Sequence, residues 1–161
     1  MTGKFRFTFG PWNIHEGADS FGPPVRKSIE LGEKLSMYKK LGFDGVQFHD
    51  DDAVPDMNDL TAQQIIARAK DMRKILEDHG LAAEFVAPRL WEDERGIDGS
   101  YTSNDAACRE YAIERSKRAI DIANSLGTDL LVLWLAREGT YIRESKDSMV
   151  STERIVYAIN Q

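Results

Sequence analysis

Two segments far apart in the chain repeat one sequence pattern. Leu41-Gly42-Phe43-Asp44 and Leu126-Gly127-Thr128-Asp129 both place a leucine-glycine pair before an aspartate, and an apolar run follows directly. Glycine at such a position favours the left-handed end of a helix, and a short bounded apolar run predicts a buried strand. Strands that alternate with helices in this way form parallel sheets with right-handed crossovers. The repeat therefore predicts an α/β fold.

The same pattern extends along the whole chain and predicts four strand-helix units in one domain, residues 1–161. The strands are expected at 5–9, 45–48, 81–87 and 130–134, and the helices at 28–41, 61–79, 102–126 and from about 147 or 151 onward. Capping boxes are expected from Thr61 with Gln64 and from Thr102 with Asp105. The fourth run is apolar throughout, which predicts a strand buried on both faces.

Four such units make half of a barrel that closes with eight. A half barrel has open edges at its first and fourth strands and exposes apolar surface there. We therefore expect a second polypeptide surface to cover these edges, either another copy of the chain or a complementing half barrel.

The composition narrows the classes of partner. The formal net charge is −6, which argues against a nucleic-acid groove or an anionic membrane surface as partner. Small neutral or cationic ligands and metal ions remain open as partners. The chain has no stretch of membrane-spanning length and no apolar signal segment at its amino terminus, so a cytoplasmic location is expected. The single cysteine, Cys108, fits a reducing compartment.

The second expected strand leads into the residues best suited to chemistry. His49 and the three carboxylates Asp50, Asp51 and Asp52 follow its carboxyl end, where α/β proteins place their active sites. Asp52 can orient the His49 ring for proton transfer near neutral pH. The same side chains also suit a divalent metal ion, and a solvated acidic loop is the third interpretation.

Three tryptophans lie just beyond expected strand ends: Trp12, Trp91 and Trp134. Each of them alone could simply fill the mouth of the barrel. Their shared position at carboxyl ends favours a wall that excludes water from a ligand. The long segment 13–24, which contains Phe21, is a loop of the length that is often functional.

Five motifs follow one another along the chain: FGPW at 9–12, FHDDD at 48–52, YTSND at 101–105, YAI at 111–113, and LVLW with REG at 131–139. In this order they resemble the amino-terminal half of the xylose isomerases of the shorter, actinobacterial type. The resemblance covers essentially the whole chain. It implies a TIM-type (β/α) barrel, here only its first four units.

The resemblance implies interconversion of an aldose and a ketose sugar by ring opening and a metal-assisted hydride shift. It assigns sugar binding and ring opening to His49, and it assigns the support of that imidazole to Asp52. The aromatic walls of the pocket correspond to Trp12, Trp91 and Trp134, with Trp91 standing where the family has phenylalanine. Phe21 corresponds to an aromatic residue that reaches into the pocket of a neighbouring subunit in a homo-oligomer.

The implied cofactors are two divalent cations, which are magnesium, manganese or cobalt. Their ligands, and the lysine that assists the hydride shift, belong to the second half of the family's barrel and have no counterpart here. We therefore expect the isolated chain to lack isomerase activity. Ala87 replaces a hydroxyl residue and Leu135-Ala136 replaces a pair of glycines, so the particular sugar stays open.

Two other functions are compatible with the sequence. One is a half barrel that dimerises as a non-catalytic sugar-binding module. The other is a different metal-dependent barrel enzyme, such as one that cleaves phosphodiesters, in which His49 and residues 50–52 are metal ligands.

Overall fold

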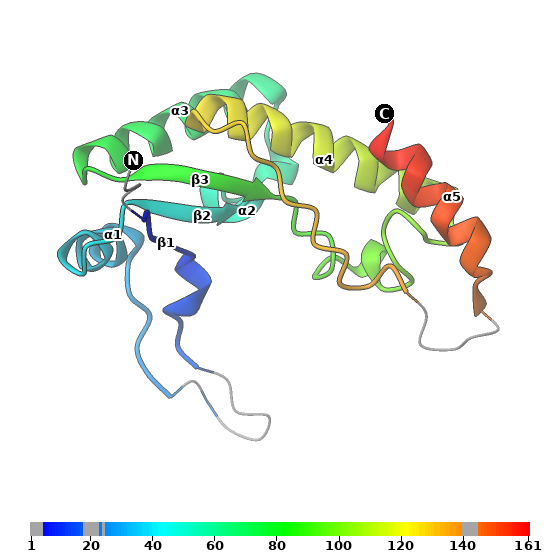
Figure 1. Cartoon of the computed structure of the whole chain (residues 1–161), viewed down its shortest axis with the longest axis horizontal. Helices are drawn as coiled ribbons and strands as arrows, with labels where there is room; N and C mark the ends of the chain where they lie inside the picture. Colours follow the sequence, from blue (N-terminus) through cyan, green and yellow to red (C-terminus); the bar gives the residue numbers. More distant parts are fainter. Residues whose placement is uncertain (1–4, 18–22, 24, 140–144) are drawn as a thin grey trace.

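The computed structural model of the chain describes residues 5–17, 23, 25–139 and 145–161. Its sheet contains three parallel strands in the order β1 (Thr8–Phe9), β2 (Gly45–His49) and β3 (Ala82–Ala87). β2 and β3 point in the same direction, so their carboxyl ends lie together at one edge of the sheet (Figure 1). This edge carries the end of β2 at His49, which is paired with Ala87.

Four longer helices connect and cover the strands. They are α1 (Leu31–Lys40), α3 (Ala62–Asp78), α4 (Ala106–Leu126) and α5 (Ser148–Ile159). α3 and α4 lie next to each other over one face of the sheet, whereas α5 lies beyond the end of the sheet (Figure 1). The short helices are η1 (Pro11–Asn13), α2 (Asp50–Ala53), η2 (Met57–Asp59) and η3 (Glu94–Gly96).

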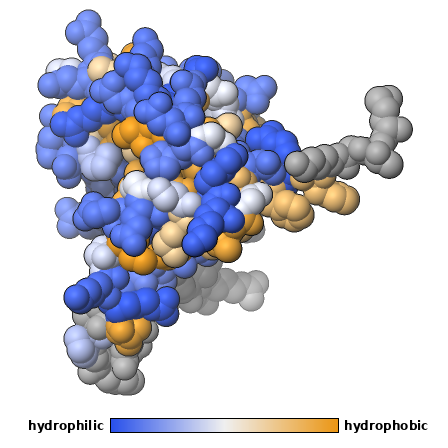
Figure 2. Space-filling model, turned by 90° about the vertical axis from the view of Figure 1, so that its left-hand side faces the viewer, coloured by the Kyte–Doolittle hydropathy of each residue, from blue (hydrophilic) through white to orange (hydrophobic). Residues whose placement is uncertain are grey.

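The core lies between the sheet and these helices. Val46 and Phe48 on β2 are fully buried, while Gln47 between them is only half-buried, because successive strand residues point to opposite faces. Leu35 and Tyr38 of α1 are buried in the same cluster. On the side of α1 and the amino ends of the strands, hydrophobic side chains reach the surface in separate patches between hydrophilic ones (Figure 2).

The helix ends expected from the sequence are confirmed at both repeats. Gly42 and Gly127 have φ angles of 86° and 85°, a left-handed conformation that residues with a Cβ rarely adopt. The capping box of Thr61 and Gln64 is also confirmed. The second box is wrong: Asp105 caps α4 by accepting a hydrogen bond from the amide of Ala107 at 2.9 Å.

The fourth expected strand takes its predicted place beside β3 but is not a strand of the sheet. Leu131 forms an isolated parallel bridge with Val86, whose amide donates to the Leu130 carbonyl at 3.1 Å. The expected burial on both faces is wrong, because Leu130 is 47% exposed and Trp134 is 62% exposed. No described strand pairs with the outer side of this segment, and so little holds it in regular strand geometry. Among the described residues, no helix is long and apolar enough to cross a membrane.

Candidate active site

The FHDDD motif ends β2 and begins a turn of helix, where the sequence predicted a polar loop. His49 closes the strand, and Asp50–Ala53 form α2. This turn brings the third carboxylate back to the histidine: Asp52 Oδ2 lies 2.9 Å from His49 Nδ1 and accepts from the His49 amide at 3.3 Å. The predicted contact between His49 and Asp52 is therefore present.

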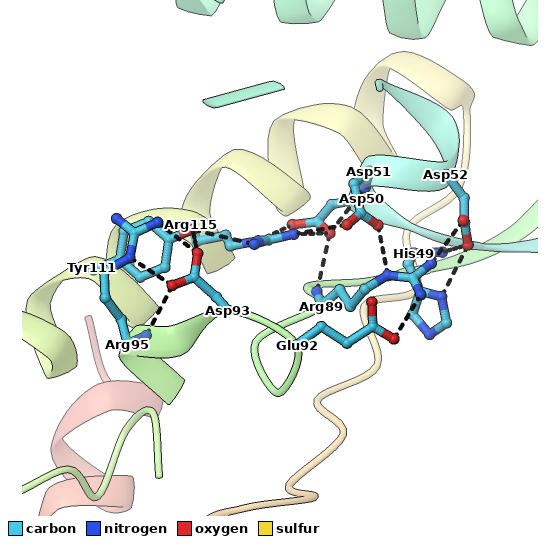
Figure 3. A network of polar contacts seen from close by, with 10 residues as sticks. All are labelled: His49, Asp50, Asp51, Asp52, Arg89, Glu92, Asp93, Arg95, Tyr111 and Arg115. Carbon is cyan, nitrogen blue, oxygen red and sulfur yellow. Dashed lines mark hydrogen bonds and ion pairs between the residues drawn. The ribbon is translucent and has the colours of Figure 1, made fainter. Parts of the chain in front are cut away.

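The contact with Asp52 determines which nitrogen of the His49 ring can accept a proton. An ionised carboxylate can only accept hydrogen bonds, so Nδ1 is the donor to Asp52 and the neutral ring keeps its lone pair on Nε2. This second nitrogen points away from Asp52 (Figure 3). The His49 side chain is 12% exposed, so the ring is mostly buried but still reaches the surface.

Aromatic rings lie around the imidazole as the sequence predicted. The ring centroid of Trp12 is 4.3 Å from that of His49, and the Trp91 centroid is 5.1 Å from it on an edge-to-face approach. The Trp91 and Trp134 centroids are 6.4 Å apart. The three indoles and the imidazole therefore converge at one edge of the sheet, with Trp134 at its exposed end. Phe21 lies outside the described residues.

The position of Trp12 depends on the absence of a side chain at Gly10. A Cβ atom at Gly10 would overlap the indole of Trp12. We expect Gly10→Ala to displace this ring from His49 and to lower the free energy of unfolding by about 1–3 kcal/mol, as overpacking does. The measurement is the NMR shift of the His49 ring protons, which lie in the ring current of the indole in the native protein.

Gly32→Ala is the matched control, because a Cβ at Gly32 meets nothing within 4 Å. It is expected to leave the His49 signals in place. His49 ring-proton shifts that stay the same in Gly10→Ala would contradict the role of Gly10.

Arg89, which follows β3, also contacts the acidic turn. Its Nη2 donates to Asp52 Oδ1 at 2.7 Å and its Nε donates to Asp51 Oδ1 at 2.8 Å. Burial by itself raises the pKa of Asp52, but the hydrogen bond from His49 and the charge of Arg89 outweigh this effect, so that the pKa lies below its usual value. Asp52 therefore remains ionised at neutral pH.

A second arginine holds the first carboxylate of the motif. Arg115 of α4 donates through Nε and Nη2 to the two oxygens of Asp50, at 2.7 and 2.9 Å. The Asp50 side chain is fully buried and that of Arg115 is 5% exposed. Arg115 Nη2 also lies 3.3 Å from Asp51 Oδ2. This pair joins the turn that follows β2 to α4 and lies to the left of His49 in Figure 3.

The network continues away from His49 through Tyr111. The Tyr111 hydroxyl accepts from Arg115 Nη1 at 3.2 Å and donates to Asp93 at 3.3 Å. The hydrogen bonds from Arg95 lower the pKa of Asp93 to about 2, and the Arg95 guanidinium lies 3.4 Å above the Tyr111 ring. These contacts hold the Arg115 guanidinium, which in turn holds Asp50.

The fourth unit contributes two further supports. Arg137 Nε donates to the carbonyl of Trp91 at 2.9 Å. Glu138, which is 8% exposed, accepts hydrogen bonds from the amides of Ser100, Tyr101 and Thr102. Arg137 and Glu138 of the REG motif therefore hold both ends of the loop from Trp91 to Thr102 by hydrogen bonds.

The sequence analysis did not predict any of these arginine contacts. They count against the interpretation of the FHDDD motif as a set of metal ligands. Asp50, Asp51 and Asp52 each face an arginine, so their oxygens are already paired within the protein, and two guanidinium charges offset much of the charge of the three carboxylates. Within the described ranges there is no group of three or more His, Cys, Asp or Glu side chains that could hold a metal ion. The acidic turn does not fit a metal ion.

Comparison with known proteins shows the family to which the chain belongs. The family model of xylose isomerase-like TIM barrels matches residues 35–161, and the chain belongs to this family. The expected family resemblance is confirmed at this level, and so is the fold, part of an α/β barrel.

Two solved structures are similar in fold. One is a D-psicose 3-epimerase in the presence of D-fructose, with a TM-score of 0.56, 20% identity, and coverage of 83% of this chain and 42% of the other. The second is a 3-keto-D-glucoside 4-epimerase from E. coli, with a TM-score of 0.54, 13% identity, and coverage of 89% and 47%. The chain thus spans less than half the length of these structures. Both are sugar epimerases and neither is a xylose isomerase.

Proposed function

We propose that the chain supplies the ring-opening part of a sugar isomerase or epimerase of the xylose isomerase-like family. The observation that carries this proposal is the His49 ring, which is held through Nδ1 by Asp52 and flanked by Trp12 and Trp91. A sugar presents hydroxyl groups on an apolar ring, so an aromatic wall beside a proton acceptor matches both parts of it. Both of the structures with a similar fold are sugar epimerases, which supports a sugar as the class of substrate.

The ring-opening step follows from the state of His49. The lone pair on Nε2 accepts the proton of the anomeric hydroxyl while the bond between the anomeric carbon and the ring oxygen breaks. The imidazolium then returns this proton to the ring oxygen, which leaves an open-chain sugar with a carbonyl group. Ionised Asp52 stabilises the imidazolium between these two transfers.

The subsequent isomerisation would use the two divalent cations that the family resemblance implies. Bound metal ions would polarise the carbonyl and hydroxyl oxygens of the open sugar. Because the carboxylates of the acidic turn already pair with Arg89 and Arg115, we place the metal ligands outside the described residues. The half barrel's open side, with Leu130 and Trp134 exposed, is where we propose that a complementing half barrel or a second copy packs. Sedimentation of the chain alone tests for self-association.

Mutarotation tests the ring-opening step separately from the metal-assisted step. We expect the purified chain to accelerate the mutarotation of D-xylose or D-glucose with saturation, as followed by polarimetry. His49→Asn is expected to reduce the catalysed rate by roughly 10²- to 10⁴-fold, the usual contribution of a general base. His79→Asn is the matched control, because His79 follows the last residue of α3 and its ring Nδ1 lies 2.8 Å from the Ile75 carbonyl, away from the acidic turn.

The same samples are then incubated with aldoses and magnesium or manganese. We expect no ketose, in agreement with metal ligands located elsewhere. Ketose formation by the chain alone would contradict that placement, and equal mutarotation by His49→Asn and the native chain would refute the role of His49.

A further inference from the structure

Arg89 contacts the functional pair through a hydrogen bond to the Asp52 carboxylate. Asp52 uses Oδ2 for His49 and Oδ1 for Arg89, so that the two oxygens of its carboxylate have different partners (Figure 3). We propose that Arg89 is a positioning residue, which orients the Asp52 carboxylate and thereby fixes His49 as the tautomer with hydrogen on Nδ1. Its importance for catalysis rests on the proposed function, but the tautomer itself does not.

Arg89 is suited to this role because its own position is fixed by several carboxylates. Besides Asp52, its guanidinium contacts Asp51 at 2.8 Å and Glu92 at 3.2 Å, and its backbone amide donates to Asp50 Oδ1 at 3.0 Å. Its side chain is 14% exposed. A planar guanidinium bound at several of its donors has little freedom to rotate. Arg89 therefore acts as a rigid brace between the ends of β2 and β3.

The effect on His49 follows from the geometry of the carboxylate. With Arg89 in place, Asp52 presents Oδ2 to Nδ1, and Nε2 is left as the proton acceptor. Without the brace, the carboxylate can rotate away. The neutral imidazole is then free to carry its hydrogen on Nε2, where it no longer accepts a proton from a substrate.

The charged groups around the pair support the same conclusion. Asp51 keeps Arg115 as a second partner, whereas Asp52 and Glu92 have no other arginine or lysine partner among the described residues. Loss of the Arg89 charge is therefore expected to raise the pKa of Asp52, since this charge is one of the causes that lower it. The two indoles beside the ring, Trp12 and Trp91, are uncharged.

NMR of the whole chain labelled with ¹⁵N in histidine tests the proposal without an activity assay. The shifts of the two ring nitrogens report the tautomer, and the His49 signals are assigned by their loss in His49→Asn. We expect a single tautomer with hydrogen on Nδ1 in the native chain and a mixture of tautomers in Arg89→Gln. A ¹³C titration of the Asp52 carboxyl should show a raised pKa in the same variant.

Arg73→Gln is the matched control, because Arg73 forms an exposed ion pair with Glu77 at 2.9 Å. It should change neither signal. Arg89→Lys keeps the charge but lacks the rigid planar fork of the guanidinium, so it should give an intermediate tautomer mixture. This variant decides the question if Arg89→Gln does not fold. An unchanged Nδ1–H tautomer in the folded Arg89 variants, even with a lower melting temperature, would overturn the proposal. Absence of mutarotation by the native chain would instead count against the proposed function alone.

Discussion

Asp50→Asn is expected to lower the free energy of unfolding by about 3–5 kcal/mol, the usual cost of removing one partner from a buried ion pair. In the variant, the charged Arg115 guanidinium faces a neutral amide. Water cannot replace the lost partner, because the side chain of Arg115 is 5% exposed and that of Asp50 is fully buried. Asp51, at 3.3 Å from Arg115, is partly exposed and offsets only part of the loss. Urea unfolding followed by circular dichroism measures the change.

Two further variants show whether the buried charge is the cause. Replacement of both partners, by Asp50→Leu with Arg115→Leu, should cost less than Asp50→Asn alone, because no unpaired charge remains. Arg73→Gln breaks an exposed pair and should cost about 0–1 kcal/mol. A cost for Asp50→Asn no larger than that of Arg73→Gln would contradict the interpretation.

Phe48→Ala is the second substitution with a large expected effect, a loss of about 3–5 kcal/mol in the free energy of unfolding. Phe48 is fully buried on β2, where it pairs with Val86 and directly precedes His49. The truncation removes a large apolar side chain and leaves a cavity that the surrounding sheet and helices fill only in part. Urea unfolding should show a lower midpoint with an unchanged slope.

Two control variants, Phe48→Leu and Phe7→Ala, test whether this loss comes from the buried volume of Phe48. Phe48→Leu keeps most of the volume and should cost less than about 2 kcal/mol. Phe7 is 61% exposed, so Phe7→Ala should change stability by no more than about 0.5 kcal/mol. Similar losses for Phe48→Ala and Phe7→Ala would mean that the core does not lie where the structure places it.

Much of the site is predictable from the sequence because its central contact is local. His49 and Asp52 are separated by three residues, and one turn of helix after a strand is enough to bring them together. The tryptophans follow from a similar rule, since carboxyl ends of parallel strands share one edge of the sheet. The polarity of residues 50–53 predicted a loop there, and only the structure shows the helical turn.

The arginine contacts are not predictable in this way. Arg89 is 37 residues from Asp52, and Arg115 is 65 residues from Asp50. Each arginine lies in a segment with many possible charged partners, and no local spacing selects among them. Only the packing of β3 and α4 against β2 brings these side chains to the acidic turn, and these contacts count against the metal-ligand alternative for that turn.

The segment 130–134 shows the same difference between what the sequence predicts and what only the tertiary structure determines. Its apolar sequence by itself determined that the chain runs parallel to β3, and the bridge between Val86 and Leu131 agrees. Only the tertiary structure decided its exposure, because burial depends on which surfaces pack against a strand and not on the strand's own residues. The sequence by itself thus determined the strand-helix units and the His49–Asp52 pair, which are set by short-range periodicity. The arginine brace and the open side were decided by contacts between residues far apart in the chain.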